Sequence, residues 1–339
     1  MNSIIQRLQS HTVSIYHLSD EILEEQIIDA RSLLVPSRFD LFAKLYYIRN
    51  RTENPIEAER IYKEHIKAFN PDLKEPGRED KNGMDDFVSS FNQLIDEFEN
   101  QDFNSAISLV PVTEDGVILD GAHRIAVLAY YDKQVGIARC KGIKPKARFD
   151  YNYFKERGLS WDTMDVIARE MVYWVPDMFV ACLLPPIKDK YNALVLIQQR
   201  FRVVYEKVLW GNIDSYRSWI RCVCDRQTWV NKLDNVKNFD FNGKMLFLFF
   251  VANSPDEFLA VREDIFDKCD LGKYSLYITE SIDETKVITE GVLNEKVRRQ
   301  LSPTSIVNKL KETIEERWYY MKHVQLINAK VAIAKVLDW

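Results

Sequence analysis

Residues 108–131 read SLVPVTEDGVILDGAHRIAVLAYY, and their apolar periodicity changes once along the way. Residues 108–112 are apolar and β-branched, residues 114–116 form a turn of the Asp-Gly type, and residues 117–119 are apolar again. From residue 120 onward, apolar side chains recur with the spacing of a helix. The stretch therefore predicts a β-hairpin that runs directly into a helix.

The predicted helix is preceded and opened by five residues that suit an anion: Asp120, Gly121, Ala122, His123 and Arg124. The first turn of a helix presents backbone N–H groups and the positive end of the helix dipole, which together favour phosphate. Arg124 adds a bidentate donor, and His123 adds a further donor. Three interpretations of Asp120 are open: it caps the helix, binds Mg²⁺ beside a phosphate, or orients a hydroxyl nucleophile. The sequence thus predicts a phosphate site with Asp120 as its candidate metal ligand.

A short β-hairpin followed by Asp-Gly-x-His-Arg at the start of a helix resembles the signature of the ParB/sulfiredoxin superfamily. The resemblance covers about residues 34–143 and comes closest to the free-serine-type kinases of that superfamily. It implies a mixed α+β domain whose motif binds ATP, or another nucleoside tri- or diphosphate, together with Mg²⁺. Carried over residue by residue, it implies that residues 120–124 bind the nucleotide and that Asp120 and His123 take part in catalysis.

Two departures from the superfamily's patterns narrow the implied activity. Sulfiredoxin has its reactive Cys between the Gly and the His of the motif, where this chain has Ala122, so sulfinic-acid reduction is not expected. Partition proteins carry an arginine-rich phosphate box and a helix-turn-helix soon after the motif, and this sequence shows neither. The resemblance therefore favours a small-molecule kinase.

The kinases of the superfamily take the carboxylate that orients the acceptor hydroxyl from a residue that precedes the motif. Glu64, in the sequence YKEH of residues 62–65, is our first candidate, and Asp40, four residues before Lys44, is the second. Surface ion pairing on a helix is the structural alternative for both. We therefore predict Glu64 as a catalytic residue, to be weighed against that alternative.

The composition is that of an ordinary soluble globular chain, because 46% of its 339 residues are hydrophobic and 29% are charged. Lys and Arg total 46 against 51 Asp and Glu, which argues against specific binding of duplex DNA. The five cysteines are odd in number and irregularly spaced, as is typical of free thiols in a reducing compartment. No stretch is apolar enough for a membrane span, and residues 1–10 lack the apolar core of a signal peptide. We expect a cytoplasmic protein.

The length predicts two or three domains. We expect an N-terminal helical segment over residues 1–33, with a helix at 19–33, and a nucleotide-binding domain over residues 34–146. Residues 147–339 would form an aromatic-rich α/β domain that shapes the acceptor pocket or mediates a homodimer.

Within the nucleotide-binding domain, Asn-Pro at residues 54–55 predicts the start of a helix that ends near residue 69. Residues 84–98 have clear amphipathic spacing, and residues 135–140 predict a strand. The charged loop at residues 70–83 is a candidate lid.

The last third of the chain predicts strands at residues 244–251 and 274–279, each followed by a capping box and a helix. The boxes are at residues 254–257 and 281–284, and the order implies parallel strands joined by a right-handed crossover. A long helix is expected at residues 305–327.

Several residues of this region are candidates for the acceptor pocket, because they follow a strand or carry aromatic rings that stack on sugars. Capping and core packing are the structural alternatives. The candidates are Thr279, Glu280, Ser281, Tyr205, Glu206, Lys207 and, in a predicted helix at residues 215–233, Trp219 and Trp229.

These observations lead to one functional expectation and two alternatives. We expect an NTP-dependent phosphotransferase that acts on a small hydroxyl compound, such as a sugar-like one. The first alternative is a nucleotide-sensing regulatory protein, and the second is a ParB-like nuclease. Turnover that depends on an added acceptor would separate the kinase from the sensor.

Overall fold

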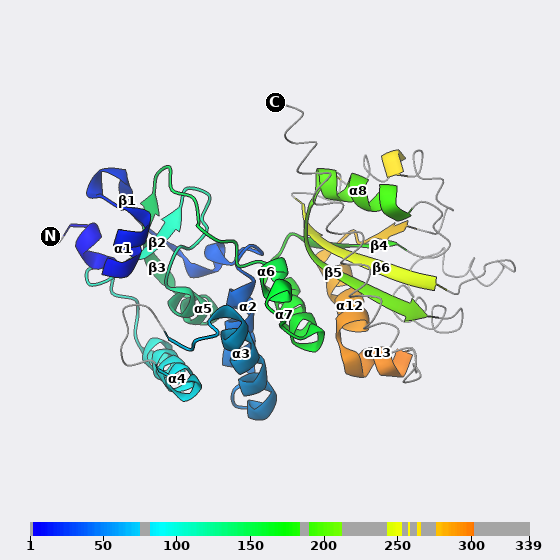
Figure 1. Cartoon of the computed structure of the whole chain (residues 1–339), viewed down its shortest axis with the longest axis horizontal. Coiled ribbons are helices and arrows are strands. Elements are labelled where there is room, and N and C mark those ends of the chain that lie inside the picture. The colour runs from blue at the N-terminus through cyan, green and yellow to red at the C-terminus, as the bar shows by residue number, and fades with distance from the viewer. Residues whose placement is uncertain are drawn as a thin grey trace, which may run out of the picture. The chain divides into compact units, whose positions relative to one another are not determined.

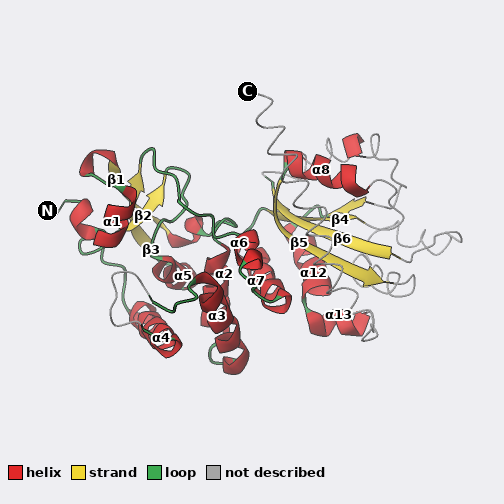
Figure 2. Ribbon diagram, viewed as in Figure 1, coloured by secondary structure: helices red, strands yellow, loops and turns green. Residues whose placement is uncertain are grey.

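The computed structural model describes residues 3–74, 82–183, 190–211, 243–252, 257, 263–265 and 276–301. The chain is a mixed α and β protein that divides into two compact units, Met1–Val175 and Pro176–Trp339 (Figures 1 and 2). The first unit extends beyond the boundary predicted at residue 146. It does so because α6 (Tyr151–Glu156) and α7 (Trp161–Trp174) pack on α3, and α7 also packs on α2.

The sheet of the first unit has the order β1-β3-β2, formed by Leu23–Asp29, Gln134–Cys140 and Val110–Thr113. The helix predicted at residues 19–33 is therefore wrong. Residues 23–29 are a strand because they pair antiparallel with β3 along their whole length, flanked by the short 3-10 helices η2 (Asp20–Ile22) and η3 (Ala30–Leu33). The N-terminal segment also contains η1 (Ile5–Arg7) and α1 (Ser10–Tyr16).

The hairpin and the helix predicted at residues 108–131 are present. After β2, the Thr113 N–H donates to the Val117 carbonyl at 2.9 Å, and Gly116 has a φ of 81° in the turn. The return arm is shorter than predicted and meets β2 through an isolated bridge from Val112 to Ile118. The chain then enters α5 (Ala122–Tyr130) and continues into β3, which lies parallel to β2. This β–α–β unit presents the amino end of α5.

Three more helices complete the first unit: α2 (Phe39–Asn50), α3 (Pro55–Phe69) and α4 (Met84–Asn100). All residues of α2 from Phe39 to Ile48 are buried, since α2 packs against α3, α5 and α7. As predicted, α3 begins with Pro55, and α4 buries one aromatic face. Asp40 and Lys44 therefore sit on a helix that has little contact with solvent.

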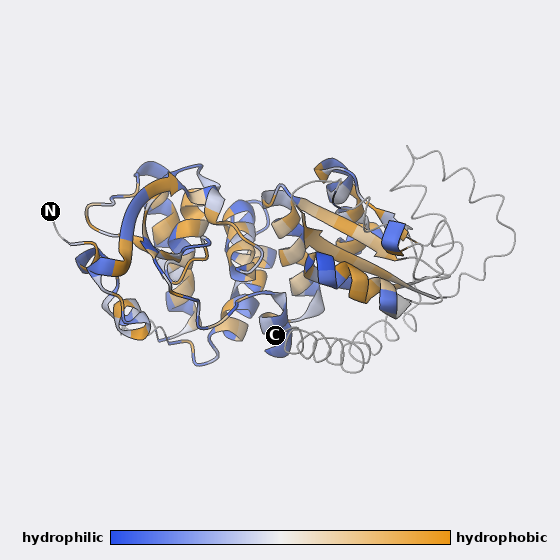
Figure 3. Ribbon diagram, turned by 90° about the horizontal axis from the view of Figure 1, so that it is seen from above, coloured by the Kyte–Doolittle hydropathy of each residue, from blue (hydrophilic) through white to orange (hydrophobic). Residues whose placement is uncertain are grey.

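The second unit contains the sheet β5-β6-β4-β7, in which all neighbouring strands are antiparallel. Its described residues include the strands β4 (Met178–Leu183), β5 (Arg202–Gly211), β6 (Gly243–Val251) and β7 (Leu276–Ile278). They also include the helices α8 (Lys190–Arg200), α12 (Ile282–Leu293) and α13 (Glu295–Leu301). Figure 3 shows that the strands of this sheet are strongly apolar. The strands β6 and β7 run in the same direction, as predicted, but β4 lies between them.

Some predicted features of this region lie outside the described residues. They are the helix at residues 215–233 with Trp219 and Trp229, most of the capping box at residues 254–257, the helix at residues 305–327, and residues 75–81 of the candidate lid. No helix in the described parts of the chain is long and apolar enough to cross a membrane.

Candidate functional site

A cavity of about 580 Å³ lies within the first unit, and the whole predicted motif lines it. The amino end of α5 contributes residues 120–124, and the buried α2 contributes Asp40 and Lys44. Arg38, directly before α2, is a further lining residue. A volume of this size is typical of small-molecule sites, so the cavity is the candidate site.

Asp120 does not cap α5. Gly121 occupies the N-cap position with a φ of 85°, and it supplies no side-chain cap to the helix. The Asp120 Oδ1 instead accepts from the Gly121 N–H at 2.6 Å, and its Oδ2 accepts from the Thr12 hydroxyl at 3.2 Å. An ionised carboxylate has about four lone-pair sites, so Asp120 retains capacity for a cation or a hydroxyl.

Arg124 folds back over the start of its own helix. Its Nη1 donates to the Ser108 Oγ at 2.6 Å. A Cβ atom on Gly121 would lie 2.9 Å from the Arg124 Nη2, and the φ of Gly121 is in the left-handed region. The left-handed backbone conformation therefore favours glycine at position 121, and a larger residue there would also displace the guanidinium of Arg124.

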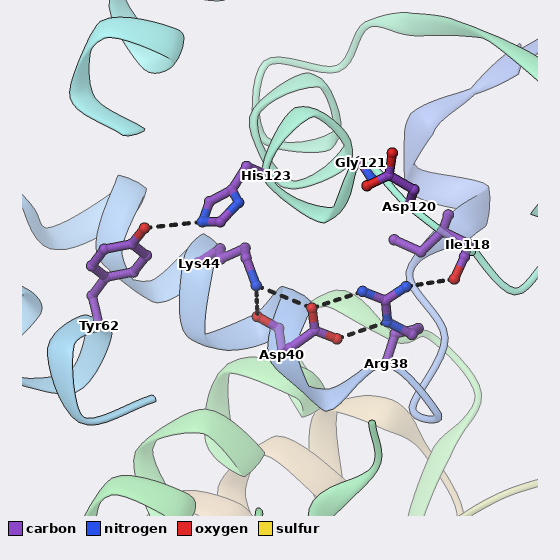
Figure 4. A network of polar contacts seen from close by, with 8 residues as sticks. All are labelled: Arg38, Asp40, Lys44, Tyr62, Ile118, Asp120, Gly121 and His123. Atoms are coloured by element: carbon purple, nitrogen blue, oxygen red, sulfur yellow. Dashed lines mark hydrogen bonds and ion pairs between the residues drawn. The ribbon is translucent and has the colours of Figure 1, made fainter. Parts of the chain in front are cut away.

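His123 is held by aromatic side chains from α3 and α4. Its Nε2 lies 2.9 Å from the Tyr62 hydroxyl, and its ring meets that of Phe91 edge-on with the centroids 4.7 Å apart. Figure 4 shows His123 and Tyr62 pointing toward each other across the gap between α5 and α3. The imidazole therefore has a fixed position on the cavity wall.

A buried ion network lies beside the motif, made by Arg38, Asp40 and Lys44 (Figure 4). Arg38 binds both Asp40 carboxylate oxygens, at 2.8 and 2.9 Å, and Lys44 Nζ lies 3.0 Å from Oδ2. Burial alone would raise the pKa of Asp40, but the charges of Arg38 and Lys44 outweigh it and hold that pKa well below its usual range. Asp40 is therefore ionised and already paired.

The same network reaches the motif through the backbone. Arg38 Nη1 donates to the carbonyl of Ile118, two residues before Asp120. Sequence reasoning did not assign Arg38 or Lys44 to the site. The sequence did contain a signal for this network: Asp40 and Lys44 lie four residues apart in a segment that is otherwise strongly apolar, so both charges were candidates for burial as a pair.

Glu64 does not line the cavity. Its carboxylate pairs with Arg60 at 2.7 Å, accepts from the Ser160 hydroxyl at 2.9 Å, and accepts from the Thr163 hydroxyl. The face of α3 that points inward carries His65 and Ile66 instead, which are 0% and 2% exposed. The structure thus gives Glu64 the ion-pairing role, at the contact with α7.

The described candidates of the second unit are explained by local structure. Thr279 accepts from the Val180 N–H at 2.9 Å and lies 2.8 Å from the Thr285 hydroxyl. The Ser281 hydroxyl caps α12 by accepting from the Glu284 N–H, and the Glu280 N–H donates to the Glu284 carboxylate. The remaining three, Tyr205, Glu206 and Lys207 on β5, are all buried.

Comparisons with protein-family models, with curated proteins and with solved structures gave no match. A function is therefore inferred from the chemistry of the cavity. Within the described residues, no group of three or more His, Cys, Asp or Glu side chains could hold a metal ion by itself.

Proposed function

We propose that the first unit binds a nucleotide by its phosphates at the amino end of α5 and transfers a phosphoryl group to a small hydroxyl compound. One observation carries the proposal. A helix of nine residues, whose N-cap is a glycine, opens into a cavity that Arg38, Lys44 and Arg124 also line. The backbone amides of a helix's first turn, the helix dipole and cationic side chains together are the usual means of binding phosphate.

The cavity suits a Mg²⁺ ion that is bound together with a nucleotide. That ion usually takes one or two carboxylates, several waters and the phosphates of the substrate, so it needs no complete cage of protein ligands. Asp120 would hold the ion, because its carboxylate lines the cavity beside the phosphate turn. When bound, the ion neutralises charge on the phosphates.

The acceptor hydroxyl also needs a group that orients it. Glu64 lies outside the cavity, and both carboxylate oxygens of Asp40 are held by Arg38 and Lys44. Of the carboxylates that the sequence singled out in the first unit, Asp120 remains. We therefore assign the orientation of the acceptor hydroxyl to Asp120. A weak base suffices for this, because phosphoryl transfer depends mainly on positioning and on charge stabilisation.

The test is phosphoryl transfer from ATP with Mg²⁺ to a panel of small alcohols, amino alcohols and sugars. The proposal predicts ADP formation that depends on an added acceptor and is lost in Asp120→Asn. Phe103→Leu, which alters a half-buried ring outside the cavity, is the control for folding. ADP formation at the same rate with and without every acceptor would contradict the proposal.

A nucleotide-sensing protein is the second candidate, and one observation favours it. Glu64 lies outside the cavity and Asp40 is held in ion pairs, so the cavity is better supplied for binding phosphate than for activating a hydroxyl. A sensor would bind the nucleotide with Mg²⁺ and show no acceptor-dependent turnover. The same assay, run alongside a binding titration, therefore separates the two functions.

A further inference from the structure

The cavity has an apolar part that a phosphate group would not use. Five side chains from three segments form this apolar wall: Ile66 and Phe69 of α3, Phe87 and Leu94 of α4, and Phe149 before α6. Phosphate is bound by amides and cations, and apolar surface adds nothing to that contact. A ligand that fills the cavity therefore combines an anionic part with an apolar one.

Phe69 and Phe149 are the aromatic members of the wall that remain half-buried. Their ring centroids lie 4.8 Å apart at an angle of 53°. The backbone of Phe149 is fixed, since its carbonyl accepts from the Phe39 N–H at 2.9 Å and it forms a parallel bridge with Arg38. Aromatic rings on the surface of a cavity are suited to stacking on a planar ring.

The aromatic pair adjoins the cations of the buried network. The Arg38 guanidinium lies 5.1 Å from the centroid of the Phe149 ring, and Lys44 Nζ lies 5.8 Å from that of Phe69. Lys44 and Arg38 both also face Asp40. The apolar wall and the cationic side chains are therefore parts of one continuous surface, as a ligand with a charged end and a planar end requires.

We propose that Phe69 and Phe149 form the subsite for the base of a nucleotide, so that the cavity recognises a nucleoside phosphate and not phosphate alone. This inference depends on the proposed function, because it concerns the same ligand. It predicts that the two parts of the ligand contribute separately. The base is held by the aromatic pair, and the phosphates are held at the amino end of α5.

The test uses calorimetric titration with two probes, inorganic tripolyphosphate and the tightest binder among ATP, GTP, CTP and UTP, each with Mg²⁺. Phe69→Leu and Phe149→Leu keep an apolar side chain and remove the aromatic ring. Each is expected to weaken nucleotide binding by about 5- to 100-fold, the scale of one stacked base, and to leave tripolyphosphate binding unchanged. Phe103→Leu, the same change at a half-buried ring outside the cavity, is expected to alter neither.

The possible results are distinguishable. Equal losses for both probes would mean that the rings support the fold of the site, and would overturn the base subsite. Unchanged nucleotide affinity in both variants would overturn it as well. Wild-type protein that binds tripolyphosphate as tightly as any nucleotide would overturn the base subsite and leave the phosphate site standing. Binding of neither probe would remove the proposed function together with this inference.

Discussion

Each unit of the protein contains a buried polar network, and the two networks differ in kind. In the first unit, Arg38, Asp40 and Lys44 are ions on the wall of a cavity. In the second unit, the hydroxyls of Thr279 and Thr285 bond to each other; Thr279 also accepts from the backbone of β4, and Thr285 donates to the carbonyl of Ser281 at the start of its own helix. Hydroxyls are inexpensive to bury once they are hydrogen-bonded, whereas ions lose a large hydration energy. A buried ion network beside a cavity therefore points to function more strongly than a buried hydroxyl network does.

Asp40→Asn is expected to have the largest effect on stability, a loss of about 3–5 kcal/mol, because it leaves Arg38 and Lys44 buried without a balancing charge. Urea unfolding at pH 7 measures it. Asp96→Asn is the matched control, since Asp96 pairs with Arg51 at the surface and is expected to contribute less than about 1 kcal/mol. Equal losses of unfolding free energy in the two variants would show that the buried ion pairs of Asp40 contribute no more than the exposed pair of Asp96.

The same variant has a characteristic dependence on pH. Because the folded-state pKa of Asp40 is lowered, its contribution is fully present above its unfolded pKa of about 3.9 and is lost as pH falls below that value. The difference in unfolding free energy between wild type and Asp40→Asn should therefore be constant from pH 5 to 8 and narrow below about pH 4. If the difference in unfolding free energy narrowed between pH 8 and 6, it would contradict the lowered pKa of Asp40.

Thr285→Val tests the hydroxyl network of the second unit. It removes the contacts to Thr279 and to the Ser281 carbonyl while keeping the shape of the side chain, so a loss of about 1 kcal/mol is expected. Nucleotide affinity should not change. Differential unfolding and calorimetry check the two statements, and altered nucleotide affinity would show that this network is not only structural.

Glu64→Gln is expected to have the smallest effect. Its ion pair with Arg60 is partly exposed, so the loss of stability should be below about 1 kcal/mol, with nucleotide binding and turnover unchanged. A fall in turnover by two or more decades would return Glu64 to the catalytic role that the sequence suggested, and would require it to approach the cavity.

Gly121 and Glu64 illustrate which features the sequence predicts and which depend on tertiary packing. The hairpin, α5 and the glycine N-cap of that helix follow from local signals: an Asp-Gly turn, a change of periodicity and a glycine before the helix. The position of Glu64 depends on α7, about a hundred residues later, whose Ser160 and Thr163 hold it. Spacing within α3 alone does not determine which of its faces meets the cavity.

Two other features depended on distant pairing in the same way. The segment at residues 23–29 has apolar residues compatible with a helix, and it becomes β1 because β3 pairs with it, Leu23 with Cys140 at one end. Arg38 and Lys44 join the site because α2 packs against α5. Local chemistry thus predicts the turn that we propose for phosphate, and tertiary packing places the cations beside it.

The central claim is that phosphates bind at the amino end of α5, and titration calorimetry of wild type and Arg124→Ala with ATP and Mg²⁺ tests it most directly. Wild type should bind at one saturable site, and the variant should lose about 1.5–3 kcal/mol of binding free energy, the scale of a charge-assisted hydrogen bond. Arg124→Lys should retain part of the affinity, because it keeps the charge without the bidentate fork. Equal affinity in wild type and a folded Arg124→Ala would contradict the claim.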